Sequence, residues 1–88
     1  MAEKPQPFPT RLRDGQWEVL IAPPEMWLRC DSEADAKTIA RSIVLRHELL
    51  EGVQSGAGVE SECRRTADVL AKYRIHFLSR WFAGQCRE

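Results

Sequence analysis

Arginine and tryptophan residues that could contact an anionic partner cluster in the first third of the chain. Arg11, Arg13 and Arg29 surround Trp27 at alternating positions of strand-like segments. Guanidinium groups bind phosphate or carboxylate oxygens, and an exposed indole suits base contacts or a protein hot spot. Nucleic-acid contacts are therefore predicted for Arg11, Arg13, Trp27 and Arg29. Burial of Trp27 beneath another helix or subunit is the alternative, because large exposed apolar patches are uncommon on monomers.

Surplus apolar side chains provide the second candidate site. Leu45 and Leu49 project from the far side of a first predicted helix, and further large residues lie near the end of a second. Aromatic anchors dominate protein interfaces. The sequence therefore predicts contacts with another protein, or a homodimer, through Trp27, Leu45, Leu49, Leu78, Trp81 and Phe82.

Basic residues also gather on the second predicted helix. Between residues 64 and 80, five cations face one acidic residue, Asp68: Arg64, Arg65, Lys72, Arg74 and Arg80. Such a sector is either a phosphate-contacting surface or a solvated face that keeps the protein soluble.

Motifs for catalysis and metal binding are missing from the sequence. It contains no glycine-rich phosphate loop, no G-x-S-x-G elbow and no H-E-x-x-H. The cysteines Cys30, Cys63 and Cys86 have no chelating spacing with each other or with the two histidines. His47 falls on an apolar helix stripe and is expected to be a hydrogen-bonded core residue. We expect no enzyme activity, no cofactor and no metal.

A three-stranded antiparallel meander is predicted to position the N-terminal arginines. Asp14-Gly15 is a favoured hairpin turn, and a proline-containing loop at 22–25 precedes a third strand at 26–30. One apolar face results from pairing Leu12 with Trp17, Trp17 with Cys30, Val19 with Leu28, and Ile21 with Met26. The other face collects Arg11, Arg13, Gln16, Glu18, Leu20, Glu25, Trp27 and Arg29, with Glu18 between Arg11 and Arg29.

Two helices are predicted after the meander, which gives an α+β fold of order βββαα. Ser32 can cap the first helix and Gly52 can end it. Its stripe should cover the sheet: Ala36, Ile39, Ala40, Ile43, His47 and Leu50. After a glycine-rich link, one long helix is predicted from Val59 to about Ala83, with Phe77 and Trp81 in its main stripe. Residues 1–9 are expected to be a flexible proline-rich arm, and residues 10–88 one small domain.

Composition narrows the function class. The 88 residues carry 13 Lys and Arg against 13 Asp and Glu, whereas nonspecific phosphate binders are usually strongly basic. A chain of this length buries only about 60 to 65% of its unfolded surface, which leaves little room for an internal substrate pocket. Three cysteines without a C-x-x-C pair fit a reducing compartment, and no apolar run is long enough to span a membrane. A cytoplasmic location is expected.

The segment 10–47 resembles the plant ethylene-response-factor domain and the arm-site domain of phage integrases. The residues that carry the resemblance are Gly15-x-Trp17, Ile21, Trp27-Leu28 and Ser32-Glu33-Ala34-x-Ala36-x-x-x-Ala40. In those families the sheet enters a DNA groove, which implies DNA contacts by Arg11, Arg13, Trp27 and Arg29. Glu18 departs from this pattern, because it places a carboxylate among the arginines.

We therefore expect a small non-enzymatic protein-binding module, such as a regulatory subunit, assembly factor or inhibitor of a larger complex. The alternative is a DNA-binding accessory protein of bacterial or phage type that uses the outer sheet face.

Overall fold

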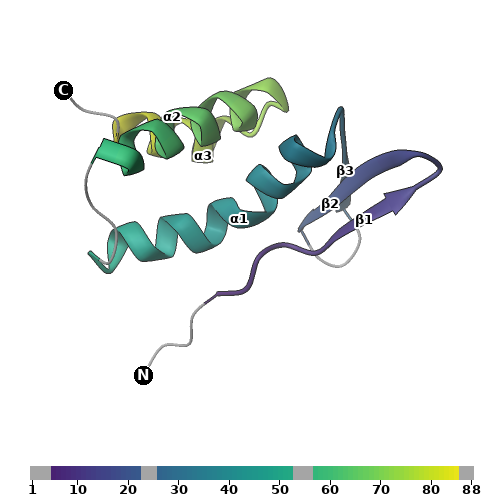
Figure 1. Ribbon diagram of the computed structural model, residues 1–88, viewed down its shortest axis with the longest axis horizontal. Helices are drawn as coiled ribbons and strands as arrows, with labels where there is room; N and C mark the ends of the chain where they lie inside the picture. Colours follow the sequence, from purple (N-terminus) through teal and green to yellow (C-terminus); the bar gives the residue numbers. More distant parts are fainter. Residues whose placement is uncertain (1–4, 23–25, 53–56, 86–88) are drawn as a thin grey trace. The chain divides into compact units, whose positions relative to one another are not determined.

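The described residues form one antiparallel sheet and three helices. The computed structural model describes residues 5–22, 26–52 and 57–85, and Figure 1 shows the order of the elements. They are β1 (Thr10–Arg13), β2 (Gln16–Ala22), β3 (Met26–Cys30), α1 (Glu33–Leu50), α2 (Ala57–Lys72) and α3 (His76–Gly84). The predicted α+β class is confirmed. The chain divides into two compact units, Met1–Leu45 and Arg46–Glu88, which we describe separately.

The predicted meander is present with strand order β1-β2-β3. Asp14 and Gly15 both have positive φ, 53° and 78°, as the tight turn between right-twisted antiparallel strands requires. Leu12 pairs with Trp17, and Glu18 lies opposite Arg11 on one side and Arg29 on the other, as predicted. This register places three charged side chains in one row across the outer face of the sheet.

The predicted pairing of Ile21 with Met26 is wrong. Met26 pairs with Ala22, because the register shifts between Leu20 and Ala22, where β2 has two steps against one step of β3. A β-bulge of this kind inserts one extra residue and bends the strand. Burial is uneven along the predicted apolar face: Val19 and Cys30 are buried, whereas Leu12 and Met26 are 59% and 61% exposed.

Local capping sets the start and end of α1. The Ser32 hydroxyl accepts a hydrogen bond from the Asp35 backbone N–H at 3.1 Å, which confirms the predicted cap. Gly52, at φ 74°, lies two residues after Leu50, the last residue of α1. The first half of the predicted stripe is buried, but Leu50 at its end is exposed. Leu45 was expected on the surface and is buried instead, because the covered side of α1 is broader than the predicted stripe.

The last described residues of the proline-rich arm are tied to the first unit. The Phe8 N–H donates a hydrogen bond to the Ala40 carbonyl at 3.0 Å, and the Leu20 N–H donates one to the Pro9 carbonyl at 2.8 Å. Two backbone hydrogen bonds fix this part of the segment that the sequence predicts to be flexible. Residues 1–4 of the arm lie outside the described residues, as does the loop at 23–25.

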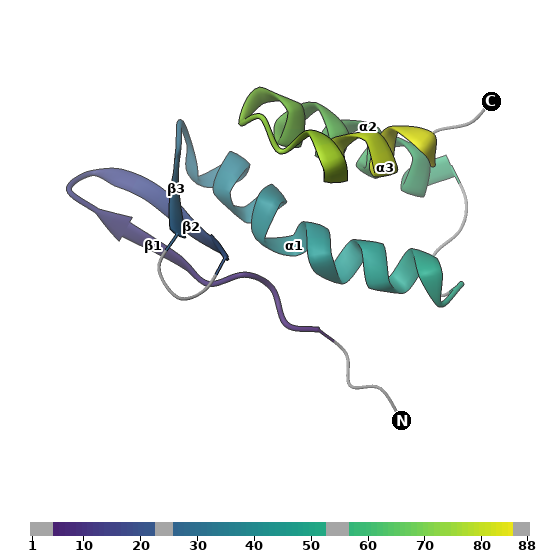
Figure 2. The same cartoon turned by 180° about the vertical axis from the view of Figure 1, so that it is seen from behind.

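The predicted single helix over 59–83 is instead two helices that fold back on each other, as Figures 1 and 2 both show. Arg74 has φ 65°, and its N–H donates to the Ala71 carbonyl while the Ile75 N–H donates to the Leu70 carbonyl. These two bonds form a Schellman motif, which ends α2. The reversal buries Phe82 completely, and the Ser79 hydroxyl donates to the Ala67 carbonyl at 2.9 Å to tie α3 to α2.

Candidate functional site

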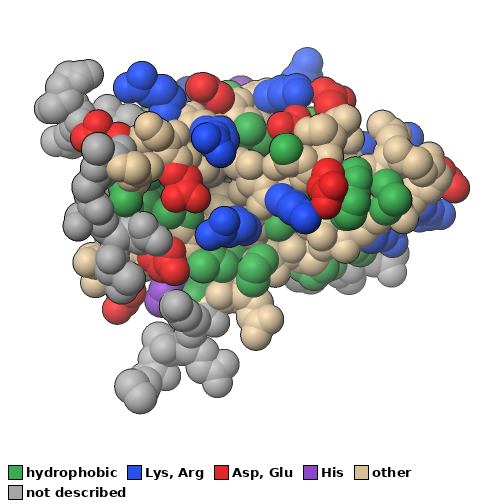
Figure 3. All heavy atoms as spheres, viewed as in Figure 1, with side chains coloured by type: hydrophobic (Ala, Val, Ile, Leu, Met, Phe, Trp, Pro, Cys, Tyr) green, Lys and Arg blue, Asp and Glu red, His purple; other side chains and the backbone are tan. Residues whose placement is uncertain are grey.

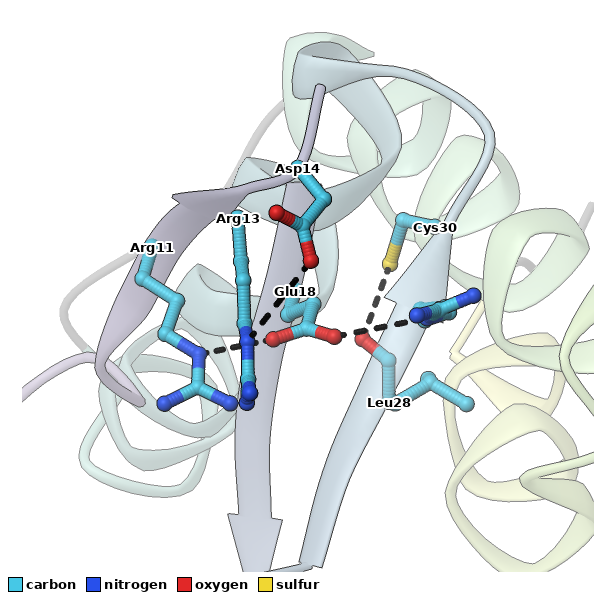
Figure 4. Close-up of polar contacts among 7 residues, drawn as sticks. Arg11, Arg13, Asp14, Glu18, Leu28 and Cys30 are labelled. Carbon is cyan, nitrogen blue, oxygen red and sulfur yellow. Dashed lines mark hydrogen bonds and ion pairs between the residues drawn. The ribbon is translucent and has the colours of Figure 1, made fainter. Parts of the chain in front are cut away.

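A buried carboxylate organises the arginines on the outer face of the sheet. Glu18 is only 5% exposed and receives hydrogen bonds from Arg11 Nε at 2.7 Å and from Arg29 Nε at 3.4 Å. Each guanidinium uses a different carboxylate oxygen, Oε1 for Arg11 and Oε2 for Arg29. Figure 4 shows the Glu18 carboxylate directed between the strands, with Arg11 beside it. Cross-strand pairing puts all three side chains at the same level of the sheet.

These contacts keep Glu18 ionised. The hydrogen bond from Arg11 is the largest influence and lowers the pKa of Glu18 below its ordinary value of 4.5. Burial opposes this effect by raising the pKa, while the Arg29 hydrogen bond and the charge of Arg13 lower it further. A buried carboxylate is stable in a protein when it is paired in this way.

Trp27 is held by the same arrangement. The Arg11 guanidinium carbon lies 3.8 Å from the centre of the Trp27 ring, within the range of a cation–π contact, and the indole is half-buried. Within this chain, Trp27 is therefore partly exposed, and Arg11 covers part of its ring. Arg11, Glu18, Trp27 and Arg29 are called the sheet cluster below.

The fourth predicted residue on this face, Arg13, lies near Glu18 and lowers its pKa through its charge, but its ion pair is with Asp14. It lies at the hairpin end, is exposed, and its Nε is 4.0 Å from Asp14 Oδ2. Arg11 and Arg29 use Nε for Glu18, and no described residue accepts a hydrogen bond from their terminal nitrogens. Those nitrogens can therefore bind an anionic ligand.

A second candidate site lies on α3. His76, Phe77, Arg80 and Trp81 line an open depression of about 620 Å³ and are called the α3 surface below. Phe77 and Trp81, like His76 and Arg80, are one helical turn apart and share a side of the helix. Phe77 is 78% exposed, the largest exposure among the large hydrophobic residues of the described chain.

Trp81 connects the α3 surface to buried residues. Its ring meets Phe82 edge-on, with centroids 5.0 Å apart and an interplanar angle of 88°. The Arg46 guanidinium carbon lies 5.4 Å from the centre of the Trp81 ring. Trp81 is half-buried as a result, so this anchor is fixed before any partner arrives.

The helix reversal changes which aromatic residues are available to a partner. Phe82, predicted as an anchor, is fully buried, and Leu45 is nearly so. Leu49 and Leu78 are half-buried. Phe77, predicted within the buried stripe, is the exposed one. The sequence does not indicate that Phe77 is exposed, because its pattern predicts one continuous helix. The turn at Arg74 starts a new helix with a different buried side, and no glycine or proline marks that turn.

The remaining candidates contribute little. His47 is half-buried, and its imidazole has no hydrogen-bond partner among the described residues, so the predicted hydrogen-bonded core histidine is not found. Cys30 and Cys63 are buried and form no disulfide with each other, and Cys86 lies outside the described residues. Within the described ranges, no group of three or more His, Cys, Asp or Glu side chains is arranged to hold a metal ion.

Charge is mixed on the face of the molecule that Figure 3 shows. In Figure 3, cationic and acidic side chains are interspersed on the face that is shown, with hydrophobic side chains between them. Arg64 and Arg65 are exposed on α2. Of the helices in the described part of the chain, none is long and apolar enough to cross a membrane.

Comparisons of the chain with models of protein families, with curated proteins and with solved structures gave no match. The functional argument therefore rests on the sheet cluster and the α3 surface themselves.

Proposed function

We propose that this chain is a small non-enzymatic protein-binding module, such as a regulatory subunit, an assembly factor or an inhibitor of a larger complex. The observation that carries the proposal is the exposure of Phe77 on the same side of α3 as Trp81, whose ring is held against the buried Phe82. An exposed aromatic ring such as that of Phe77 loses an unfavourable contact with water when a partner covers it, and aromatic residues dominate interface energies. The partner is another protein, with a homodimer as one form of such a complex.

The test is a capture experiment from the native host with the tagged full chain, run with and without nuclease. We expect one stoichiometric protein to be recovered despite nuclease treatment, and to be lost with Phe77→Ala. Leu50→Ala is the matched control, because Leu50 is also an exposed apolar side chain in the same unit. Equal recovery by wild type, Phe77→Ala and Leu50→Ala would contradict the assignment to α3.

The state of association has its own measurement. Light scattering over a range of concentrations distinguishes a homodimer from a monomer that awaits a different chain. A dimer that Phe77→Ala dissociates would identify the partner as a second copy. We also propose a cytoplasmic location, supported by the absence of a disulfide between the described cysteines Cys30 and Cys63, since disulfides are rare in reducing compartments.

DNA binding by the sheet is the second candidate. It is favoured by the sheet cluster, in which Arg11 and Arg29 are held by Glu18 and keep terminal nitrogens free of described partners. This geometry also gives Glu18 a positioning role, which makes it compatible with the resemblance to the ethylene-response-factor and integrase arm-site domains. Such a protein would be an accessory factor of bacterial or phage type.

Salt dependence of duplex binding tests this second candidate. Arg11→Ala and Arg29→Ala should each weaken binding and flatten its dependence on salt, because each removes a phosphate contact and the associated counterion release. Arg41→Ala, at an exposed arginine on α1, is the control and should bind like wild type. Duplex affinity unchanged by Arg11→Ala would count against the sheet as a DNA-binding surface.

A further inference from the structure

The stretch of sequence that contains the α3 surface is rich in positive charge. From residue 69 through residue 85 the sequence contains no Asp or Glu, but it contains Lys72, Arg74 and Arg80 together with His76. Arg74, His76 and Arg80 are exposed, and none of them forms an ion pair with a described residue. Arg11, Arg29 and Lys37 elsewhere in the chain do have carboxylate partners.

The backbone at Arg74 supplies an independent observation. Arg74 occupies the position after the α2 C-cap with φ 65°, a conformation that glycine adopts freely and that costs other L-residues energy. Glycine is the usual residue at this point of a Schellman motif. Here the position holds instead an exposed guanidinium two residues before the α3 surface begins. Backbone strain of this kind is concentrated at functional sites.

The exposed side chains of this region combine an apolar contact with cationic groups. Phe77 and the depression beside Trp81 offer an apolar contact, and Arg74 and Arg80 offer planar guanidinium groups. Guanidinium groups bind carboxylates through paired hydrogen bonds, and the exposed aromatic contacts an apolar side chain. A phosphate backbone supplies the negative charge but no apolar side chain for the depression.

We propose that the α3 surface and Arg74 recognise an acidic polypeptide segment of another protein, with an apolar side chain of that segment in the depression. This inference rests on the proposed protein-binding function and specifies the chemical class of its partner. The carboxylates of the segment pair with Arg74 and Arg80, and the His76 ring lines the same depression as Arg80.

The test is selection of random displayed peptides on the immobilised full chain. We expect enriched peptides to combine several Asp or Glu residues with one Trp, Phe or Leu. The affinity of the best synthetic peptide is then measured by fluorescence anisotropy. Arg74→Gly and Arg80→Gln should each weaken it by about tenfold, as expected when one charged contact is lost. Raising the salt concentration should weaken it as well.

Matched variants separate lost binding from lost folding. Arg74→Gly removes the guanidinium and relieves the backbone, so its thermal midpoint should be at least that of wild type. Arg41→Gln removes an exposed arginine in the other unit and should leave peptide affinity unchanged.

Each remaining result would overturn the inference in a distinguishable way. Enriched peptides that are neutral or basic, yet require Phe77, would exclude an acidic partner and retain the protein-binding function. Failure to enrich any peptide that requires Phe77 would overturn both. Tighter binding of an oligothymidine strand than of the best peptide would identify the surface as a single-strand nucleic-acid site, because bases also stack on aromatic side chains.

Discussion

The sheet cluster and the α3 surface both contain arginine and tryptophan, but the arginines differ in whether the fold supplies them with a carboxylate partner. In the sheet cluster, Arg11 and Arg29 find their carboxylate within the fold, on Glu18, and Arg11 also covers Trp27. Arg80 on the α3 surface, and Arg74 two residues before that surface begins, have no described carboxylate partner. The difference teaches that arginine and tryptophan indicate a binding site only once the position of the nearest carboxylate is known.

The two regions also differ in how well their aromatic side chains are covered by neighbouring residues. Trp27 lies beneath an arginine that is itself held by an ion pair, so little of its ring can reach a partner. On α3, Trp81 is braced by Phe82 and Arg46, while Phe77 extends into solvent. Because Trp81 is already held in place next to the exposed Phe77, less conformational entropy is lost when a partner binds.

The largest expected effect contrasts two phenylalanines of α3. Phe82→Ala removes a fully buried ring and should lower the free energy of unfolding by about 3–5 kcal/mol. Phe77→Ala should change it by no more than about 0.5 kcal/mol, because that side chain is on the surface. Urea denaturation measures both. A large destabilisation by Phe77→Ala would show that Phe77 belongs to the core and not to a binding surface.

The next effect tests whether Glu18 organises the sheet. Its pKa is lowered in the folded state, so it contributes stability above its ordinary value of 4.5, and that contribution is lost as the pH falls through the lower folded pKa. Glu18→Gln should therefore be less stable than wild type at pH 7, and its stability should fall less on acidification below pH 4.5. Thermal unfolding across this pH range measures the difference. Parallel curves for the two proteins would mean that the ion pairs contribute nothing.

A smaller effect of opposite sign is expected at Arg74. Arg74→Gly should raise the free energy of unfolding by about 0.5–1 kcal/mol, because relief of the positive φ exceeds the added flexibility of the unfolded chain. Denaturant titration measures the gain. A loss of stability would mean that the Arg74 side chain contributes to the fold, which would weaken the contrast with Arg11.

The smallest effect is expected at Arg13. Its nearest carboxylate is 4.0 Å away on an exposed Asp14, and such surface pairs contribute little. Arg13→Ala should change the free energy of unfolding by less than about 0.5 kcal/mol, whereas Arg11→Ala removes both an ion pair and the cover of Trp27. Denaturation of the two variants under one condition tests the ranking. Equal losses of unfolding free energy in the two variants would show that Arg13 stabilises the sheet as much as Arg11 does.

Local signals explain which parts of this fold could be predicted from the sequence. Asp14-Gly15 specifies its turn, Ser32 caps α1, and strand alternation places Glu18 between Arg11 and Arg29. Those features depend on neighbouring residues, as rules of turn and cap chemistry require.

Two predictions, the strand register at Ile21 and the single long helix, failed where the backbone adopts a conformation usually marked by glycine. The bulge at Ile21 carries no glycine, and the turn at Arg74 uses a non-glycine residue at positive φ. The turn at Arg74 had the larger consequence for the candidate site. With one continuous helix, Phe77 falls in the buried stripe and Phe82 outside it, and the reversal at Arg74 exchanges their roles. Tertiary packing of α3 on α2 overrides the local helical pattern there.

The most direct measurement compares partner binding by wild type, Phe77→Ala and Leu50→Ala, each first shown to have the wild-type unfolding midpoint. The account predicts that Phe77→Ala loses more than about 1 kcal/mol of binding free energy while Leu50→Ala binds like wild type. Full binding by a folded Phe77→Ala protein would contradict the claim that α3 presents the anchor of a protein-binding module.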